Sequence, residues 1–232
     1  MSIIVYWACT EDEWLRAKEP ESVYKNFIKK IKNKKTNIES CPSIKNYANN
    51  TFSIKSIYSY NFEILNKTEG AFSNLYDQNF FDKHVLVRSQ IDKLFSFTQG
   101  FVFFTEKKSL NMSAGILPYL EDNDINKKCI VIPGTFDIGK WFRPIDFAFY
   151  LKNNYNDFEI KEEEIFQYIK FDTNEKIIFK QFKFNEKLNK YLLDIINAKN
   201  FRTKKTKNLE DYYLMLKHKK HIINEIKNNL LN

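Results

Sequence analysis

The sequence is poor in the residues that make turns, disulfides and metal sites. Its 232 residues include only five glycines, five prolines, three cysteines and three histidines. Cys9, Cys41 and Cys129 stand far apart and form no CxxC pair, so they fit neither a disulfide framework nor a structural zinc site. We therefore expect a reducing environment such as the cytoplasm.

The motifs of several enzyme classes are absent as well. The sequence has neither GxxxxGKS/T nor GxGxxG, which argues against a P-loop or Rossmann nucleotide site. It has no GxSxG elbow, and His84 is its only histidine before His218, so no catalytic triad is predicted. We expect no cofactor, and whether the protein is an enzyme stays open at this stage.

Long apolar runs are missing too. No run approaches the roughly 20 apolar residues that a membrane-spanning helix needs. The opening residues MSIIVYWACTEDEW lack the basic start of a signal peptide, and acidic residues follow their short apolar run. We therefore expect a soluble, cytoplasmic protein that has no membrane partner.

Aromatic residues are abundant, and they favour strands. The chain has 22 phenylalanines and 13 tyrosines and is 43% hydrophobic. Short strand-like runs follow one another between Phe52 and Phe184: TFSIKSI, YNFEIL, HVLVRS, LFSFTQGFVFF, CIVIPG, FAFYL, IFQYIKF and KIIFKQFKF. This pattern predicts an antiparallel β core that is a sandwich, a jelly roll or barrel-like. The DTNEK segment, 172–176, is expected to form a hairpin turn.

Helical patterns lie on both sides of this core. Residues 2–8 are expected to form a buried first strand, followed by a capping box at Thr10 and a helix with an apolar stripe over 23–31. Asn185 can cap one C-terminal helix, and a second is expected from Asn208 onward. The predicted fold is α+β, with a mainly antiparallel β domain at 1–184 and, at 185–232, a basic helical extension packed on it.

The positive charge is concentrated at the C-terminal end. Residues 183–232 contain 12 Lys or Arg against 5 Asp or Glu, whereas residues 1–182 contain 25 against 24. Such a surface attracts an acidic protein, or nucleic acid without regard to sequence. The candidate partner-binding residues are Arg202, Lys204, Lys205, Lys207, Lys217, Lys219 and Lys220.

The segment PGTFDIGKWFRP, 133–144, is dense in turn residues and charges, and Pro133-Gly134 fits a type II turn. One interpretation is a ligand pocket, with Trp141 as an apolar wall, Arg143 as an anion clamp and an aspartate as acceptor or base. The other is a corner whose charges pair with one another, and the sequence favours it. The candidate ligand-binding residues are Asp137, Lys140, Trp141, Arg143 and Asp146.

The sequence does not predict a metal site at the C-terminal end. His218, His221 and Glu225 have a spacing that places them on one helix face. Neighbouring lysines oppose a divalent cation, so a solvated basic face is the better interpretation.

Four short segments carry a resemblance to known sequences: CPSIKNY (41–47), GILPYL (115–120), WFRPIDFAF (141–149) and EEEIFQYIKF (162–171). Together they resemble uncharacterised proteins of marine T4-like phages and, more remotely, a bacterial domain family of unknown function. The resemblance spans about 40–180 and implies a phage protein in the cytoplasm of an infected bacterium. A composition rich in Lys, Asn, Ile and Phe is typical of an AT-rich genome.

The sequence favours a non-catalytic interaction protein, such as a viral accessory or assembly factor. It would bind an acidic partner through its basic C-terminal helices. The alternative is a small-molecule enzyme or sensor that binds an anionic ligand in a pocket around 112–146.

Overall fold

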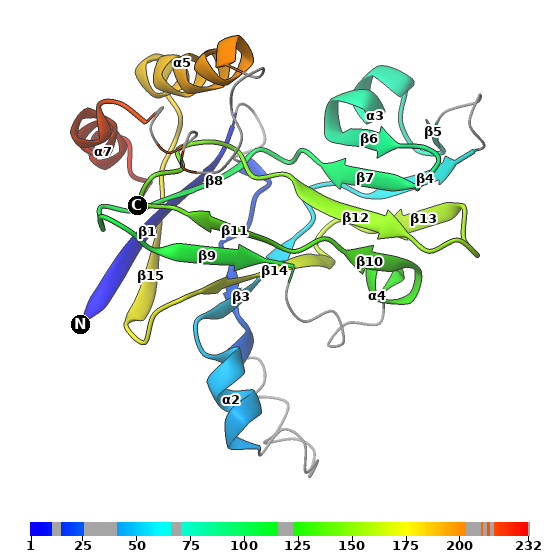
Figure 1. The fold of residues 1–232 in the computed structure, drawn as a ribbon, viewed down its shortest axis with the longest axis horizontal. Helices are drawn as coiled ribbons and strands as arrows, with labels where there is room; N and C mark the ends of the chain where they lie inside the picture. The colour runs from blue at the N-terminus through cyan, green and yellow to red at the C-terminus, as the bar shows by residue number, and fades with distance from the viewer. Residues whose placement is uncertain are drawn as a thin grey trace.

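The computed structural model describes residues 1–10, 15–25, 41–65, 71–115, 123–202, 210, 213 and 216–231. Mostly antiparallel sheets with helices around them make up the fold, which confirms the α+β class (Figure 1). Each of the four sheets described ends in edge strands, and none closes into a barrel. The predicted capping box and most of the apolar stripe after it lie outside the described residues.

A three-stranded sheet, here called the central sheet, contains the first strand of the chain. Its order is β15 (Lys176–Gln181), β1 (Ser2–Cys9), β8 (Phe101–Phe104). β1 runs antiparallel to β8 but parallel to β15, so the mainly antiparallel fold contains this one described parallel pair. The prediction of a first strand at 2–8 is confirmed.

Two strands of the central sheet, β1 and β8, are buried on both faces. Val5 and Trp7 of β1 point into the main hydrophobic cluster, whereas Tyr6 and Ala8 belong to a second cluster on the opposite face. β8 behaves in the same way. This explains why its sequence, FVFF, is apolar throughout rather than alternating.

The other strands form three further sheets. The five-stranded sheet has the order β11 (Gly134–Asp137), β9 (Asn111–Ala114), β14 (Ile165–Phe171), β3 (Thr51–Lys55), β2 (Glu21–Ser22). The four-stranded sheet has the order β10 (Cys129–Val131), β12 (Phe147–Leu151), β7 (Leu94–Phe97), β6 (Val85–Ser89). The smallest has the order β13 (Asp157–Ile160), β4 (Tyr60–Ile64), β5 (Ala71–Ser73).

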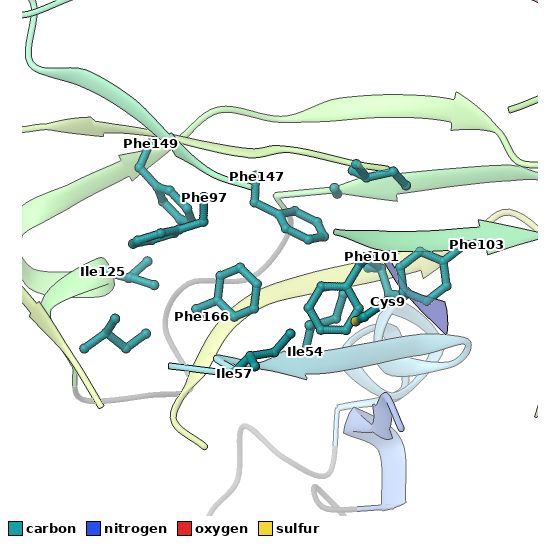
Figure 2. Close-up of a cluster of buried hydrophobic side chains, with 14 of the residues drawn as sticks. Cys9, Ile54, Ile57, Phe97, Phe101, Phe103, Ile125, Phe147, Phe149 and Phe166 are labelled. Atoms are coloured by element: carbon teal, nitrogen blue, oxygen red, sulfur yellow. The ribbon is translucent and has the colours of Figure 1, made fainter. Parts of the chain in front are cut away.

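Phenylalanines fill the space between these sheets. Figure 2 shows Phe97, Phe149 and Phe166 turned toward one another, and the rings of Phe97 and Phe149 lie 5.5 Å apart. Phe97 and Phe149 are fully buried. Edge-to-face contacts recur through this cluster, as the aromatic quadrupole favours.

Helices cover the remaining faces and ends. Three short helices, α2 (Pro42–Ala48), α3 (Gln78–His84) and α4 (Asp124–Lys128), connect strands. The two C-terminal helices, α5 (Glu186–Arg202) and α7 (Lys219–Asn228), lie together on the outer face of the central sheet (Figure 1). Within the described part of the chain, no helix is both long and apolar enough to cross a membrane.

The C-terminal helices and the central sheet share one hydrophobic group, here called the helix-side cluster. Its buried members are Tyr6, Ala8, Val102, Phe104, Phe142, Phe182, Phe184, Leu188, Leu192, Ile195, Ile222, Ile223 and Ile226. The amide of Leu188 donates to Asn185 Oδ1 at 2.9 Å, which confirms the predicted cap of α5.

Three local expectations are wrong. DTNEK does not close a hairpin, because β14 pairs with β3 and β9 whereas β15 pairs with β1 in another sheet. The helix expected from Asn208 onward is not continuous: residues 210 and 213 are helical, but residues 216–218 are not, and α7 begins at Lys219 after His218, which has a left-handed φ of 62°. Gly134 is not in a type II turn: it has no positive φ and already pairs with Ala114 as the start of β11.

The buried aromatic core gives a direct test of this packing. Replacing the fully buried Phe97 with Ala should lower the free energy of unfolding by about 3–5 kcal/mol, because it leaves a cavity between the sheets. Phe72→Ala, on β5, removes a ring that is 46% exposed and should cost less than about 1 kcal/mol. Urea unfolding of both variants measures the difference, and equal costs would contradict the assignment of the core.

Candidate functional site

The segment 133–144 connects two sheets twice. Pro133 follows β10 of the four-stranded sheet, and the chain then enters β11 of the five-stranded sheet. After the turn at 138–140 it returns to β12 of the four-stranded sheet. These two crossings account for the local density of proline and glycine.

Asp137 is the electrostatic centre of this corner. Its side chain is buried, and Oδ2 accepts from the Ser109 hydroxyl at 2.7 Å and pairs with Lys140 Nζ at 3.1 Å. Oδ1 accepts from the backbone amides of Leu110 and Gly139, both at 3.0 Å. A carboxylate offers about four acceptor positions, and four donors engage this one.

The ionisation of Asp137 reflects these contacts. Burial alone would raise the pKa of its carboxyl, but the hydroxyl, amide and ammonium donors hold that pKa below its usual value. The carboxylate is therefore charged at neutral pH. With its acceptor positions engaged by the protein, it is a structural anion rather than a base directed at a ligand.

The remaining candidate ligand residues have other partners. The Arg143 guanidinium lies 5.1 Å from the centre of the Trp141 ring, and that ring contacts Phe136. Asp146 forms an ion pair with Arg88 of β6 at 2.9 Å. The structure thus brings Asp137 and Lys140 together and stacks Arg143 on Trp141, while it commits Asp146 to a different sheet.

Lys219, at the start of α7, is anchored to the same corner. Its Nζ donates to the backbone carbonyls of Lys107 and Gly139 at 2.6 and 2.7 Å and lies 5.5 Å from the Phe104 ring centre. Burial lowers the pKa of Lys219, and Asp137 opposes that effect. The sequence grouped Lys219 with partner-binding lysines, whereas the structure shows its ammonium holding two loops to the last helix.

Two tyrosines add further connections between these elements. The backbone amide of Asp137 donates to the hydroxyl of Tyr213 at 2.8 Å. The Tyr6 hydroxyl donates to Glu106 at 2.6 Å, and Lys227 of α7 pairs with that carboxylate at 2.9 Å. Burial and this hydrogen bond raise the pKa of Tyr6, while the hydrogen bonds from Tyr6 and Lys227 lower the pKa of Glu106.

The other candidate partner-binding residues fall into three sets. Lys217 and Lys220 are exposed, and in the described part of the chain neither forms an ion pair. Arg202 ends α5. Lys204, Lys205 and Lys207 lie outside the described residues, so their prediction stays untested.

The possible metal ligands do not form a cluster. The rings of His218 and His221 lie 5.9 Å apart, and the Glu225 carboxylate accepts from Asn185 at 2.7 Å and pairs with Lys187 at 3.6 Å. No group of three His, Cys, Asp or Glu side chains suited to a metal occurs among the residues the structure describes.

A groove that the sequence did not indicate lies away from this corner. It has a volume of about 900 Å³ and runs between β15 and the segment 18–25. The one signal in the sequence was the pair Lys176 and Lys180 on either side of the apolar residues 177–179, because lysines are typical of a strand at a sheet edge.

No family model, no curated protein and no solved structure matches this sequence. The resemblance to phage proteins therefore stays a prediction that rests on its four short segments.

The corner predicts a pH-dependent effect of Asp137→Asn. A carboxyl with a lowered folded pKa stabilises the protein above its unfolded pKa of about 3.9, and this contribution is lost as the pH falls through the folded value. The free energy of unfolding of the variant should therefore be about 3 kcal/mol lower than that of wild type at pH 7. This deficit should shrink below about pH 4. Urea unfolding of both proteins at pH 7 and at about pH 3 measures the deficit.

Asp146→Asn is the matched control, because the Asp146 side chain is 40% exposed in its pair with Arg88. We expect a cost of less than about 1 kcal/mol at either pH. A deficit for Asp137→Asn that stayed constant between pH 7 and pH 3 would contradict the role given to its charge.

Proposed function

We propose that this chain is a non-catalytic interaction protein whose C-terminal helices bind an acidic protein partner. The observation that carries the proposal is the pair of exposed lysines at the start of α7, Lys217 and Lys220, which have no ion pair in the described part of the chain.

The position of these lysines is unfavourable for the helix itself. The N-terminal end of a helix carries the positive end of its dipole, which favours acidic residues, but the first turn of α7 contains none. Lysines at this end raise the local positive potential and lower the stability of the helix. Attraction of an anionic partner would give this unfavourable placement of charge a function.

The small number of lysines without an internal partner supports a protein partner more than a nucleic acid. Lys219 binds backbone carbonyls and Lys227 binds Glu106, so Lys217 and Lys220 are the two lysines of 216–231 that have no ion pair or carbonyl partner in the described part of the chain. A nucleic acid backbone requires several successive cationic contacts. Following the phage resemblance, we propose that this contact is made in an infected bacterium, where the chain would serve as an accessory or assembly factor.

The corner at 133–144 gives less support to the alternative, an enzyme or sensor for anionic small molecules. Such a site needs a carboxylate or guanidinium directed into a cavity. Asp137 instead receives four internal donors, and the Arg143 guanidinium stacks on Trp141.

Charge reversal at the exposed lysines tests the proposal. Wild type and the double variant Lys217→Glu/Lys220→Glu are titrated with poly-L-glutamate and with mixed-sequence duplex DNA at low and moderate salt. We expect wild type to bind poly-L-glutamate in a salt-sensitive manner and the variant to bind about tenfold more weakly.

The control variant, Lys152→Glu/Lys161→Glu, makes the same change in charge on the two loops that flank β13 and should retain binding. Equal loss in both variants would mean that only net charge matters and would contradict a specific basic surface. Preference for DNA over poly-L-glutamate would replace the acidic protein with a nucleic acid partner.

A further inference from the structure

The groove between the central sheet and the five-stranded sheet has main chain on both sides. One wall is formed by Lys176–Phe179 of β15, and the other by residues 18–22 with β2. Phe52 and Phe179 lie between them, with ring centres 4.8 Å apart. The complete lining is Lys18, Glu19, Pro20, Glu21, Ser22, Lys25, Phe52, Lys55, Glu163, Lys176, Ile177, Ile178 and Phe179.

The edge of β15, rather than one of its faces, borders this groove. Successive side chains of a strand point to opposite faces, so four consecutive residues can line one groove only where the backbone edge faces it. β15 is the last strand of the central sheet, and its only strand partner in the described part of the chain is β1.

The same edge already accepts an added segment a few residues further along. Leu231 donates its amide to the carbonyl of Gln181 at 2.9 Å, and Lys183 donates to Asn229 at 3.0 Å. The bridge between Phe182 and Leu230 is antiparallel. The chain after α7 therefore extends the sheet beside 181–183, and among the described residues no strand pairs with the outer edge of 176–180.

The alternation of hydrogen bonds identifies the groups that face the groove. Phe182 donates to Trp7 of β1, whereas Gln181 and Lys183 bond to the outer segment. Because the bonding direction alternates along a strand, Ile177 and Phe179 direct their amides and carbonyls outward. These are the groups that a further strand would pair with.

We propose that this groove binds an extended acidic peptide as an additional strand, antiparallel to β15. An added strand satisfies the outward amides and carbonyls, and its alternate side chains enter the groove beside Phe52 and Phe179. The site is separate from the basic surface at the start of α7 and does not depend on that proposal.

The lysines determine the chemistry of the partner. Within the lining, Lys18 pairs with Glu163 at 3.3 Å and Lys55 with Glu21 at 2.7 Å. Lys25, Lys176 and one acid, Glu19, have no ion pair in the described part of the chain, so the unpaired charge of the lining is net positive. The lining therefore favours a carboxylate at the end of the bound strand.

A second copy of this chain is a poorer occupant. Antiparallel pairing of β15 with itself about Ile178 would place Lys176 opposite Lys180, and like charges directly opposite are destabilising. Lysines at an exposed edge are a common protection against such self-pairing.

Three synthetic peptides test the pairing. All are capped and alternate Val and Thr between terminal glutamates. One is unmethylated, and the other two carry N-methyl groups on alternate amides, one peptide in each phase. In only one of the two methylated peptides do the N-methyl groups replace the N–H donors that would face Ile177 and Phe179. We expect the unmethylated peptide and one methylated peptide to bind saturably in fluorescence anisotropy, and the other to bind at least tenfold more weakly.

Charge reversal on both partners tests the assigned position. Lys176→Glu should weaken binding of the glutamate-ended peptide by about tenfold and should favour a lysine-ended version of it. The control Lys190→Glu alters an exposed lysine on α5 and should leave both affinities unchanged. The preference for the lysine-ended peptide shows that the variant is folded and that Lys176 contacts the peptide.

Three results would overturn the proposal. The first is the absence of saturable binding by any unmethylated peptide, and the second is equal binding of the two methylated peptides. The third is a dimer, seen by sedimentation, that Lys176→Glu dissociates, since this would make a second copy the occupant of the edge.

Discussion

The face of the central sheet that points away from the main hydrophobic core is also apolar and consists of Tyr6, Ala8, Val102 and Phe104. An apolar sheet face of this kind must be covered, because exposing it to water would cost the free energy that its burial supplies. The helices α5 and α7 cover it. Because β1 and β8 are apolar on both faces, the C-terminal helices must pack on the face that the main core does not cover. Their packing in turn determines which of their charged side chains contact the β core and which face the solvent.

The polar contacts at the edge of this layer are secondary to that burial, but they fix its register. Lys219 reaches two backbone carbonyls beside Phe104, and Lys227 reaches the carboxylate that also accepts from Tyr6. Each bond joins α7 to a loop or strand of the β core. Asp137 holds the loop that presents one of these carbonyls. Part of the basic charge is thus structural, and only the remainder is directed to the solvent.

Strand-like runs were recognisable in the sequence because β-branched and aromatic residues are concentrated in them, and β3, β12, β14 and β15 lie where the runs predicted. Short strands such as β9, NMSA, carry no such signal. Pairing was harder to predict: adjacent runs favour a hairpin, yet β14 and β15 belong to different sheets. Likewise, nothing local distinguishes Lys219 from Lys220, because burial against Phe104 is a property of the tertiary fold.

Open sheets leave edges, and the way this chain treats its edges differs from place to place. Beside 181–183 its own residues supply the missing partner, so amides and carbonyls there are satisfied internally. Beside 176–180 the chain offers lysines instead, which oppose a second copy but attract carboxylates. An edge that was only a hazard could have been protected by a proline or a bulge. Exposed lysines flanking apolar residues protect the edge while leaving its backbone free to pair with a strand of the opposite charge.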